Sequence, residues 1–267
     1  MLIRGVLLAL TSIGLSAAER LDYGCSRPLE VGVMPMGALY FDDRGIKRGL
    51  DVDLVEEVSR RTGCLIELRE LSRVLQLRLL KSGQIAIGTA MAIDSVRARD
   101  HYVLPLMESR NEMLLARPAL DHVQTPADLI SVPGHVLGVV GGAVHGEPYD
   151  SLVESLRAQK RVVVAPDHGS NMQQLRQGRI QALIAHPFMH ASSFIPAAEL
   201  EQRFRILKWG KREDALKGGW ALSRARFSPQ QAERWREMFA TMRTDGTLLR
   251  LLTRYVGQAR AQEMLVR

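Results

Sequence analysis

The sequence has little of what several classes of protein require. Aromatic residues make up 5% of the 267 residues, which leaves few rings for stacking on nucleic-acid bases. It contains no zinc-finger, helix-turn-helix or RNA-binding signature, and its seven histidines are scattered without an HExxH motif. These features disfavour nucleic-acid binding, and we expect neither a metal site nor another cofactor.

Long apolar runs are also missing, apart from one near the N-terminus. This uncharged run, residues 5–15, follows Arg4 and precedes the small residues Ser16, Ala17 and Ala18. A short positive start, an apolar run and a small-residue cleavage site are typical of a secretory signal, and the run is short for a membrane span. We therefore expect a signal peptide at 1–18 and a periplasmic mature protein. The alternative is an N-terminal core helix.

The overall composition is that of a folded protein with a basic surplus. Apolar residues account for 46% and charged residues for 24%, and 36 Lys and Arg against 29 acidic residues give a net charge of +7. This surplus suits an anionic ligand, a membrane surface or nucleic acid, but total charge does not choose among them. No repeat of about 20 to 50 residues is visible, which disfavours solenoids and propellers.

Only two cysteines are present, and each stands just before an apolar run. Cys25 precedes the run 29–33 and Cys64 precedes the run 65–68. If both runs form neighbouring parallel strands, both thiols lie at the same end of the sheet, and export permits a disulfide. We expect a Cys25–Cys64 bridge. Two separate buried thiols are the alternative.

The chain alternates between strand-like and helix-like segments in two successive units. In the first unit, expected strands at 29–33, 65–68 and 85–91 alternate with expected helices at 51–61 and 74–81. In the second, expected strands at 136–140, 161–165 and 180–185 alternate with helices at 148–159 and 170–177; a strand at 220–223 and helices from 228 to 255 follow. This order predicts two open α/β sheets with a ligand cleft between them.

Six short motifs occur in order along residues 28–258. They are Gly49-Leu50-Asp51-Val52-Asp53-Leu54, Leu80-Lys81-Ser82-Gly83, Asp94-Ser95-Val96-Arg97, Thr125-Pro126-Ala127-Asp128-Leu129, Gly138-Val139 and Met242-Arg243-Thr244-Asp245-Gly246-Thr247. Together they resemble the amino-acid-type (family 3) periplasmic solute-binding proteins.

The resemblance implies a type II periplasmic binding protein fold of two lobes, each a mostly parallel sheet flanked by helices. Lobe one would comprise 19–118 and 213–267, and lobe two 119–212, with two chain crossings as the hinge. A small anionic or amino-acid-like ligand would close the lobes, and the closed form would dock on the permease of an ABC-type uptake system. We expect a monomer without catalytic activity.

The resemblance also indicates which first-lobe residues contact the ligand. Arg97 matches the arginine that forms a two-pronged contact with the ligand carboxylate, although Arg99 lies close enough to leave the register open. Arg73 would add a second cation, or else be an exposed residue on a short helix. The backbone at the end of the third strand would line the cleft through Thr89, Ala90 and Ala92.

In lobe two, the loop with Gly142 and Ala143 resembles an anion-binding turn, and His145 follows it. His186 stands where amino-acid binders carry an aspartate for the ligand ammonium, and an imidazolium there would attract an anion instead. We therefore expect a small carboxylate or another anion without an ammonium group. The alternatives are an accessory or sensor protein beside a periplasmic dehydrogenase or membrane receptor, and an enzyme similar to cyclohexadienyl dehydratases.

Overall fold

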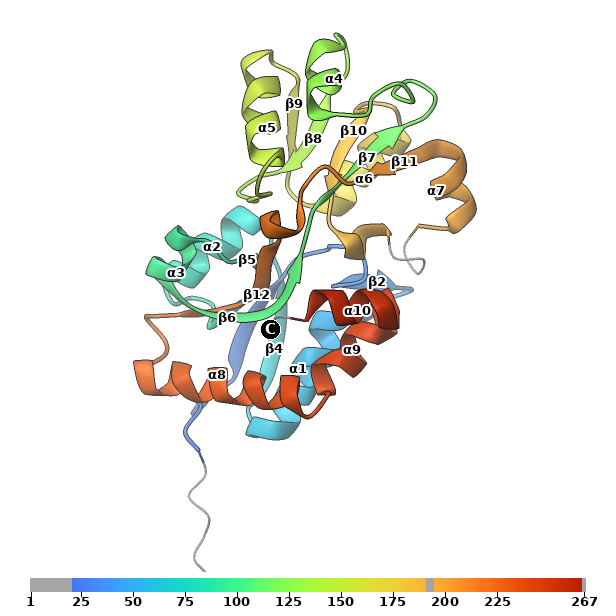
Figure 1. The fold of residues 1–267 in the computed structure, drawn as a ribbon. Helices are drawn as coiled ribbons and strands as arrows, with labels where there is room; N and C mark the ends of the chain where they lie inside the picture. Colours follow the sequence, from blue (N-terminus) through green and yellow to red (C-terminus); the bar gives the residue numbers. More distant parts are fainter. Residues whose placement is uncertain (1–20, 191–194, 266–267) are drawn as a thin grey trace, which may run out of the picture.

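Two five-stranded sheets, each covered by helices, form the two lobes of the computed structural model, which describes residues 21–190 and 195–265 (Figure 1). The expected signal peptide, 1–18, lies outside these residues. Within the described ranges, no helix has the length and apolar character needed to cross a membrane.

The first sheet contains the predicted parallel strands and two antiparallel additions. Its strand order is β4 (Ile66–Glu70), β1 (Leu29–Val33), β5 (Ile87–Ala92), β12 (Leu216–Ser223) and β6 (His101–Ser109). β1 runs parallel to β4 and β5, whereas β12 runs antiparallel to β5 and β6. The apolar side chains of β1 are fully buried, as expected for a central parallel strand covered on both faces.

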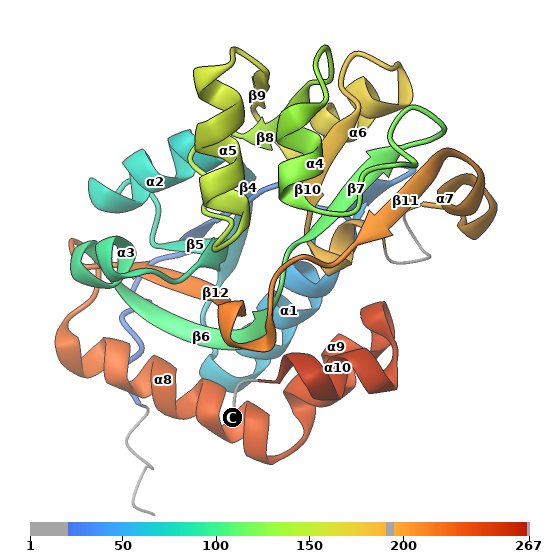
Figure 2. The same cartoon turned by 45° about the horizontal axis from the view of Figure 1, so that its top comes forward.

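Helices cover both faces of this sheet, and a small hairpin forms a separate two-stranded sheet in the same lobe. The elements are β2 (Phe41–Asp43), β3 (Ile46–Arg48), α1 (Leu50–Thr62), α2 (Arg73–Lys81), α3 (Ser95–Asp100), α8 (Pro229–Thr244), α9 (Thr247–Val256) and α10 (Gln258–Met264). Figures 1 and 2 show α8 at the end of lobe one that is remote from lobe two, and α9 packs beside α1. The capping box of Ser228 and Gln231 starts α8, as the Ser-Pro sequence predicts.

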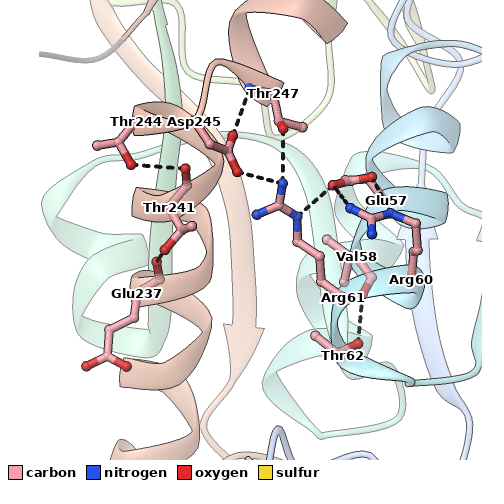
Figure 3. Close-up of polar contacts among 10 residues, drawn as sticks. All are labelled: Glu57, Val58, Arg60, Arg61, Thr62, Glu237, Thr241, Thr244, Asp245 and Thr247. Carbon is pink, nitrogen blue, oxygen red and sulfur yellow. Dashed lines mark hydrogen bonds and ion pairs between the residues drawn. The ribbon is translucent and has the colours of Figure 1, made fainter.

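A polar cluster fastens the C-terminal helices to lobe one (Figure 3). Arg61 of α1 donates hydrogen bonds to Asp245 (2.8 Å) and Thr247 (3.0 Å) in the turn between α8 and α9, and to Glu57 (2.6 Å) in its own helix. Hydrogen bonds from Arg60 and Arg61, offset only in part by desolvation, lower the pKa of Glu57 to about 2. The Asp-Gly-Thr sequence thus has a structural role here.

The second sheet has the order β11 (Phe204–Leu207), β7 (Glu112–Ala116), β10 (Ala182–Ala185), β8 (Leu137–Val140) and β9 (Val162–Ala165). Around it lie α4 (Pro126–Ser131), α5 (Tyr149–Ala158), α6 (His168–Arg176), α7 (Ala197–Arg203) and the 3₁₀ turns η1 (Pro187–His190) and η2 (Arg212–Asp214). β8, β9 and β10 are parallel, so the loops that follow them lie at one edge of the sheet.

The chain crosses between the lobes from β6 to β7 and again from β11 to β12, and the two crossings run side by side in both views (Figures 1 and 2). β7 pairs with β10 and β11, so residues 112–116 belong to the sheet of lobe two. The sequence analysis had assigned them to lobe one, and the expected boundary at 118/119 is therefore several residues too late. The second crossing lies between 207 and 216, around the expected boundary at 212/213.

The disulfide between Cys25 and Cys64 is present, with Cα atoms 5.5 Å apart. β1 and β4 are parallel neighbours in which Leu29 pairs with Ile66, so the segments before them lie together. The prediction is therefore confirmed for the reason given: both thiols stand at the amino ends of adjacent strands.

Candidate functional site

A cavity of about 80 Å³ lies between the lobes. Its first-lobe wall comes from β5, β12 and the loop after β1, and its second-lobe wall from the loops after β8, β9 and β10. This volume is smaller than an ordinary ligand pocket, so the lobes lie close together in this structure.

Much of the cavity wall is apolar and adaptable. Met34, Met36, Met91 and Met107 contribute thioether side chains, and Trp220 closes one side. Methionine has three rotatable bonds and fills irregular space, so this wall can adapt to guests of different shapes. The apolar wall makes the few charged and polar groups decisive for ligand choice.

Arg97 of α3 reaches the cavity from lobe one and also contacts lobe two. Its Nη1 donates to the carbonyl oxygen of Ala92 (3.1 Å) and to Asp94 Oδ2 (2.8 Å). Its Nη2 donates to the carbonyl oxygen of Gly142 (2.8 Å) in lobe two. Burial lowers the pKa of Arg97, but an arginine keeps its charge at neutral pH. The residue is thus a buried cation at the junction of the lobes.

Arg73 also lines the cavity, but its donors serve its own lobe. Its guanidinium donates to the carbonyl oxygens of Thr89 (3.0 Å) and Ala90 (2.6 Å), to Gln76 and to the sulfur of Met91. Burial, reinforced by the nearby Arg97, lowers its pKa to about 9. Arg73 is therefore not the exposed residue of the alternative reading. It braces the end of β5, where Ala90 has a left-handed φ of 52°.

Asp51 is a site residue that the sequence analysis used only as part of a motif. Its buried carboxylate lines the cavity and accepts a hydrogen bond from Thr89 Oγ1 at 2.7 Å. Burial raises its pKa to about 6, and the Thr89 hydrogen bond opposes this only in part. Thr89 does not line the cavity itself but supports Asp51 from behind. The first aspartate of the Gly49–Leu54 motif was the available signal.

Three histidines face the cavity from lobe two, one after each parallel strand. His145 follows β8, His168 begins α6 after β9, and His186 follows β10. Burial lowers the pKa of His145 to about 4 and that of His168 to about 3, which leaves both rings neutral at pH 7. His168 was not predicted, and its buried Nδ1 has no hydrogen-bond partner within the described part of the chain.

His186 is held by two contacts at the end of β10, where the sequence predicts a histidine whose imidazolium would attract an anion. The backbone N–H of Phe188 donates to its Nδ1 at 3.4 Å, and its Nε2 is hydrogen-bonded to Ser109 Oγ. The Phe188 contact favours the tautomer that carries the proton on Nε2, in which Nε2 donates to the serine oxygen.

The loop after β8 uses two of its amide groups within lobe two. The N–H of Gly141 donates to Ala165 (3.0 Å) and that of Ala143 to Val140 (3.1 Å), and α5 begins only at Tyr149. The expected anion-binding turn therefore lacks the Ala143 amide, and for Gly142 it stays a prediction. Gly142 presents its carbonyl to Arg97, while Ala143 lines the cavity.

Most of the predicted residues come together at the cavity, with Thr89 and Gly142 directly behind its wall. The first crossing adds residues that were not predicted as ligand contacts. Ser109 lines the cavity, and Asn111 donates from Nδ2 to the carbonyl oxygen of His145 at 2.8 Å. Across residues 21–190 and 195–265, no group of three or more His, Cys, Asp or Glu is arranged to hold a metal ion.

The sequence matches no protein-family model and no curated protein, but the fold matches many solved structures. An ancestral arginine-binding protein bound to glutamine has a TM-score of 0.70 at 20% identity, covering 86% of this chain and 98% of that one. A putative binding component of an ABC transporter from Wolinella succinogenes, complexed with lysine, has a TM-score of 0.68 at 19% identity, covering 88% and 98%. EhuB in complex with hydroxyectoine has a TM-score of 0.72 at 15% identity, covering 90% and 93%. The chain therefore has the two-lobed fold of type II periplasmic binding proteins.

Proposed function

We propose that this chain is an amino-acid-type (family 3) solute-binding protein that captures a small carboxylate-bearing solute between its lobes. It would act in the periplasm as a monomer, exported by the segment 1–18, and deliver its ligand to the permease of an ABC-type uptake system. The observation that carries the proposal is the position of Arg97: a buried guanidinium at the junction of the lobes.

A carboxylate is the natural partner for this guanidinium. At present Arg97 donates to the carboxylate of Asp94 and to the carbonyl groups of Ala92 and Gly142. A carboxylate carries a full negative charge and can accept two parallel hydrogen bonds from a guanidinium, whereas a carbonyl group presents only a dipole. A ligand carboxylate that takes over such contacts would thus gain more than the carbonyl groups lose, and it would still lie between the two lobes.

The second-lobe wall supports a ligand whose other end is uncharged. His145 and His168 are neutral, and each neutral imidazole offers one donor and one acceptor. The position after β10 holds His186 rather than an acidic residue, so this wall gives a ligand ammonium no fixed negative charge. The carboxylate of Asp51 in the first-lobe wall accepts a hydrogen bond from Thr89 and lies near Arg73, so its charge is engaged within lobe one. We therefore propose a carboxylate without an ammonium group, for example a hydroxy acid or a keto acid.

We propose a binding protein and not an enzyme. The structural neighbours named above carry bound ligands, and two of them are a binding protein and a putative binding component of a transporter. Within the cavity, the Ser109–His186 pair resembles a catalytic dyad in composition, but the tautomer that the Phe188 contact favours has Nε2 donating its proton to Ser109 instead of accepting one.

A thermal-shift panel tests the proposal. Succinate, lactate, 2-oxoglutarate, glutamate, glutamine and arginine are each added to wild type, Arg97→Ala and the control Arg99→Ala, which removes an exposed arginine from the same helix. A ligand at 100 times its Kd stabilises by about 2.7 kcal/mol, which is about 5 °C or more for a chain of this size. We expect an acid without an ammonium group to produce this shift in wild type and Arg99→Ala only.

Two results would overturn the proposal. Stabilisation by amino acids alone would contradict the ligand class, whereas an equal shift in the Arg97→Ala protein would contradict the binding residue.

A further inference from the structure

Asp94 makes two separate contacts with Arg97. Its Oδ1 accepts the backbone N–H of Arg97 at 2.7 Å and thereby caps α3, while its Oδ2 accepts Nη1 of the guanidinium at 2.8 Å. The Arg97 side chain is 9% exposed and that of Asp94 is 28% exposed. The arginine at the centre of the proposed function thus already holds a carboxylate from its own chain.

This contact changes what the guanidinium can offer to a ligand. Nη1 has two protons, and both are donated, one to Ala92 and one to Asp94. An end-on, two-pronged contact needs one proton from Nη1 and one from Nη2. While Ala92 and Asp94 both hold these protons, a ligand carboxylate must displace one of them to bind in this mode, and the negative charge of Asp94 also offsets the attraction that a buried cation exerts on an anion.

The helix cap does not require this charge. Ser, Asn and Asp are comparable N-cap residues, because each accepts the same backbone N–H. An uncharged side chain could therefore supply the Oδ1 contact that caps the helix. An uncharged side chain could not form an Oδ2–Nη1 contact of the same strength, because that contact joins two opposite charges. The contact with the guanidinium is an additional feature of Asp94.

We propose that Asp94 is a built-in competitor for the ligand carboxylate at Arg97 and so determines specificity. This inference rests on the proposed function. A guest that binds end-on needs a proton of Nη1, for which Asp94 Oδ2 competes with a full negative charge, and the partly exposed Asp94 side chain can turn toward solvent. Simple carboxylates gain too little from this exchange, whereas a ligand that also hydrogen-bonds the imidazoles of lobe two binds tightly. Asp94 thereby selects against the abundant small carboxylates.

Acetate is the probe that tests this inference, because it presents a carboxylate with no group for lobe two. Acetate is titrated against wild type, Asp94→Ser and Asp94→Asn by thermal shift, with chloride added to match ionic strength. Both variants keep a capping group. Asp167→Asn is the matched control, since Asp167 caps α6 at the same cleft and bonds Ser170.

We expect both Asp94 variants to bind acetate about tenfold more tightly than wild type, which is the order of one charge-assisted hydrogen bond. The control should match wild type, and the double variant Asp94→Ser with Arg97→Ala should lose the effect. A tighter affinity is diagnostic, because structural damage to the cap would weaken binding.

Unchanged or weaker acetate binding in both Asp94 variants would overturn the inference while leaving the proposed function intact, provided that larger carboxylates still stabilise wild type through Arg97. If no carboxylate stabilises wild type or either variant, the proposed function fails and this inference fails with it.

Discussion

Replacing Asp51 by Asn should change how the stability of the protein depends on pH. The Asp51 carboxyl is fully buried beside the cavity and accepts a hydrogen bond from Thr89 Oγ1. An asparagine has nearly the same shape, and its carbonyl oxygen can accept the same hydrogen bond. The substitution therefore removes the ionisable group with little change in packing.

The size of the effect follows from the pKa of Asp51, which burial raises from 3.8 to about 6. Because the folded state binds the proton more tightly than the unfolded state, stability falls as pH rises from about 4 to 6. Above this range the ionised carboxyl costs about 3 kcal/mol, since each pKa unit is about 1.4 kcal/mol. About half of this cost, roughly 1.5 kcal/mol, develops between pH 5 and pH 8.

The assay is the melting temperature of Asp51→Asn minus that of wild type, measured at pH 5 and pH 8. We expect this difference to be about 3 to 5 °C more positive at pH 8, at roughly 2 to 4 °C per kcal/mol. Glu56→Gln, which changes an exposed carboxyl on the same helix, should give no such trend. A difference that is equal at both pH values, or larger at pH 5, would refute the reasoning.

Three further predictions concern other parts of the molecule. Replacing Cys25 and Cys64 by Ser should lower the free energy of unfolding by about 4 kcal/mol in urea titrations, because the bridge closes a loop with a sequence separation of 39; an unchanged midpoint would contradict this. Gly219→Ala should sharply reduce the yield of folded protein on gel filtration, since a Cβ atom would lie 2.0 Å from the carbonyl oxygen of Leu104, and wild-type yield would contradict this. His186→Asp should shift the thermal-shift panel toward amino acids by supplying a partner for their ammonium group, and an unaltered ranking of ligands would count against the role given to this position.

Strands and helices whose own residues determine their conformation could be predicted from the sequence. The runs at 29–33 and 161–165 are apolar and rich in β-branched residues, and both are strands within one residue of the expected limits. The helix at 228 begins where its capping residues indicate. The disulfide followed from the placement of two strands side by side, and Arg97, which lines the cavity, was indicated by the resemblance of Asp94-Ser95-Val96-Arg97 to the family motif.

Features that depend on distant partners were beyond the sequence analysis. β6 contains Pro105, which weakens any strand pattern, and it is stabilised by pairing with β12 more than a hundred residues later. Asp51 and His168 become site residues only when the sheets place α1 and α6 at the same cavity. Arg73 donates its hydrogen bonds to β5 because of the direction of its side chain, which the sequence does not show. The amides on either side of Gly142 are hydrogen-bonded within lobe two because of backbone pairing, which the sequence does not show either.

Native mass spectrometry of the protein, purified from its natural host without refolding, tests the central claim most directly. The account predicts that wild type retains a small molecule that carries a carboxylate and no amine, and that Arg97→Ala purified in the same way does not. Retention of an amine-bearing molecule, or of the same molecule by both proteins, would contradict it.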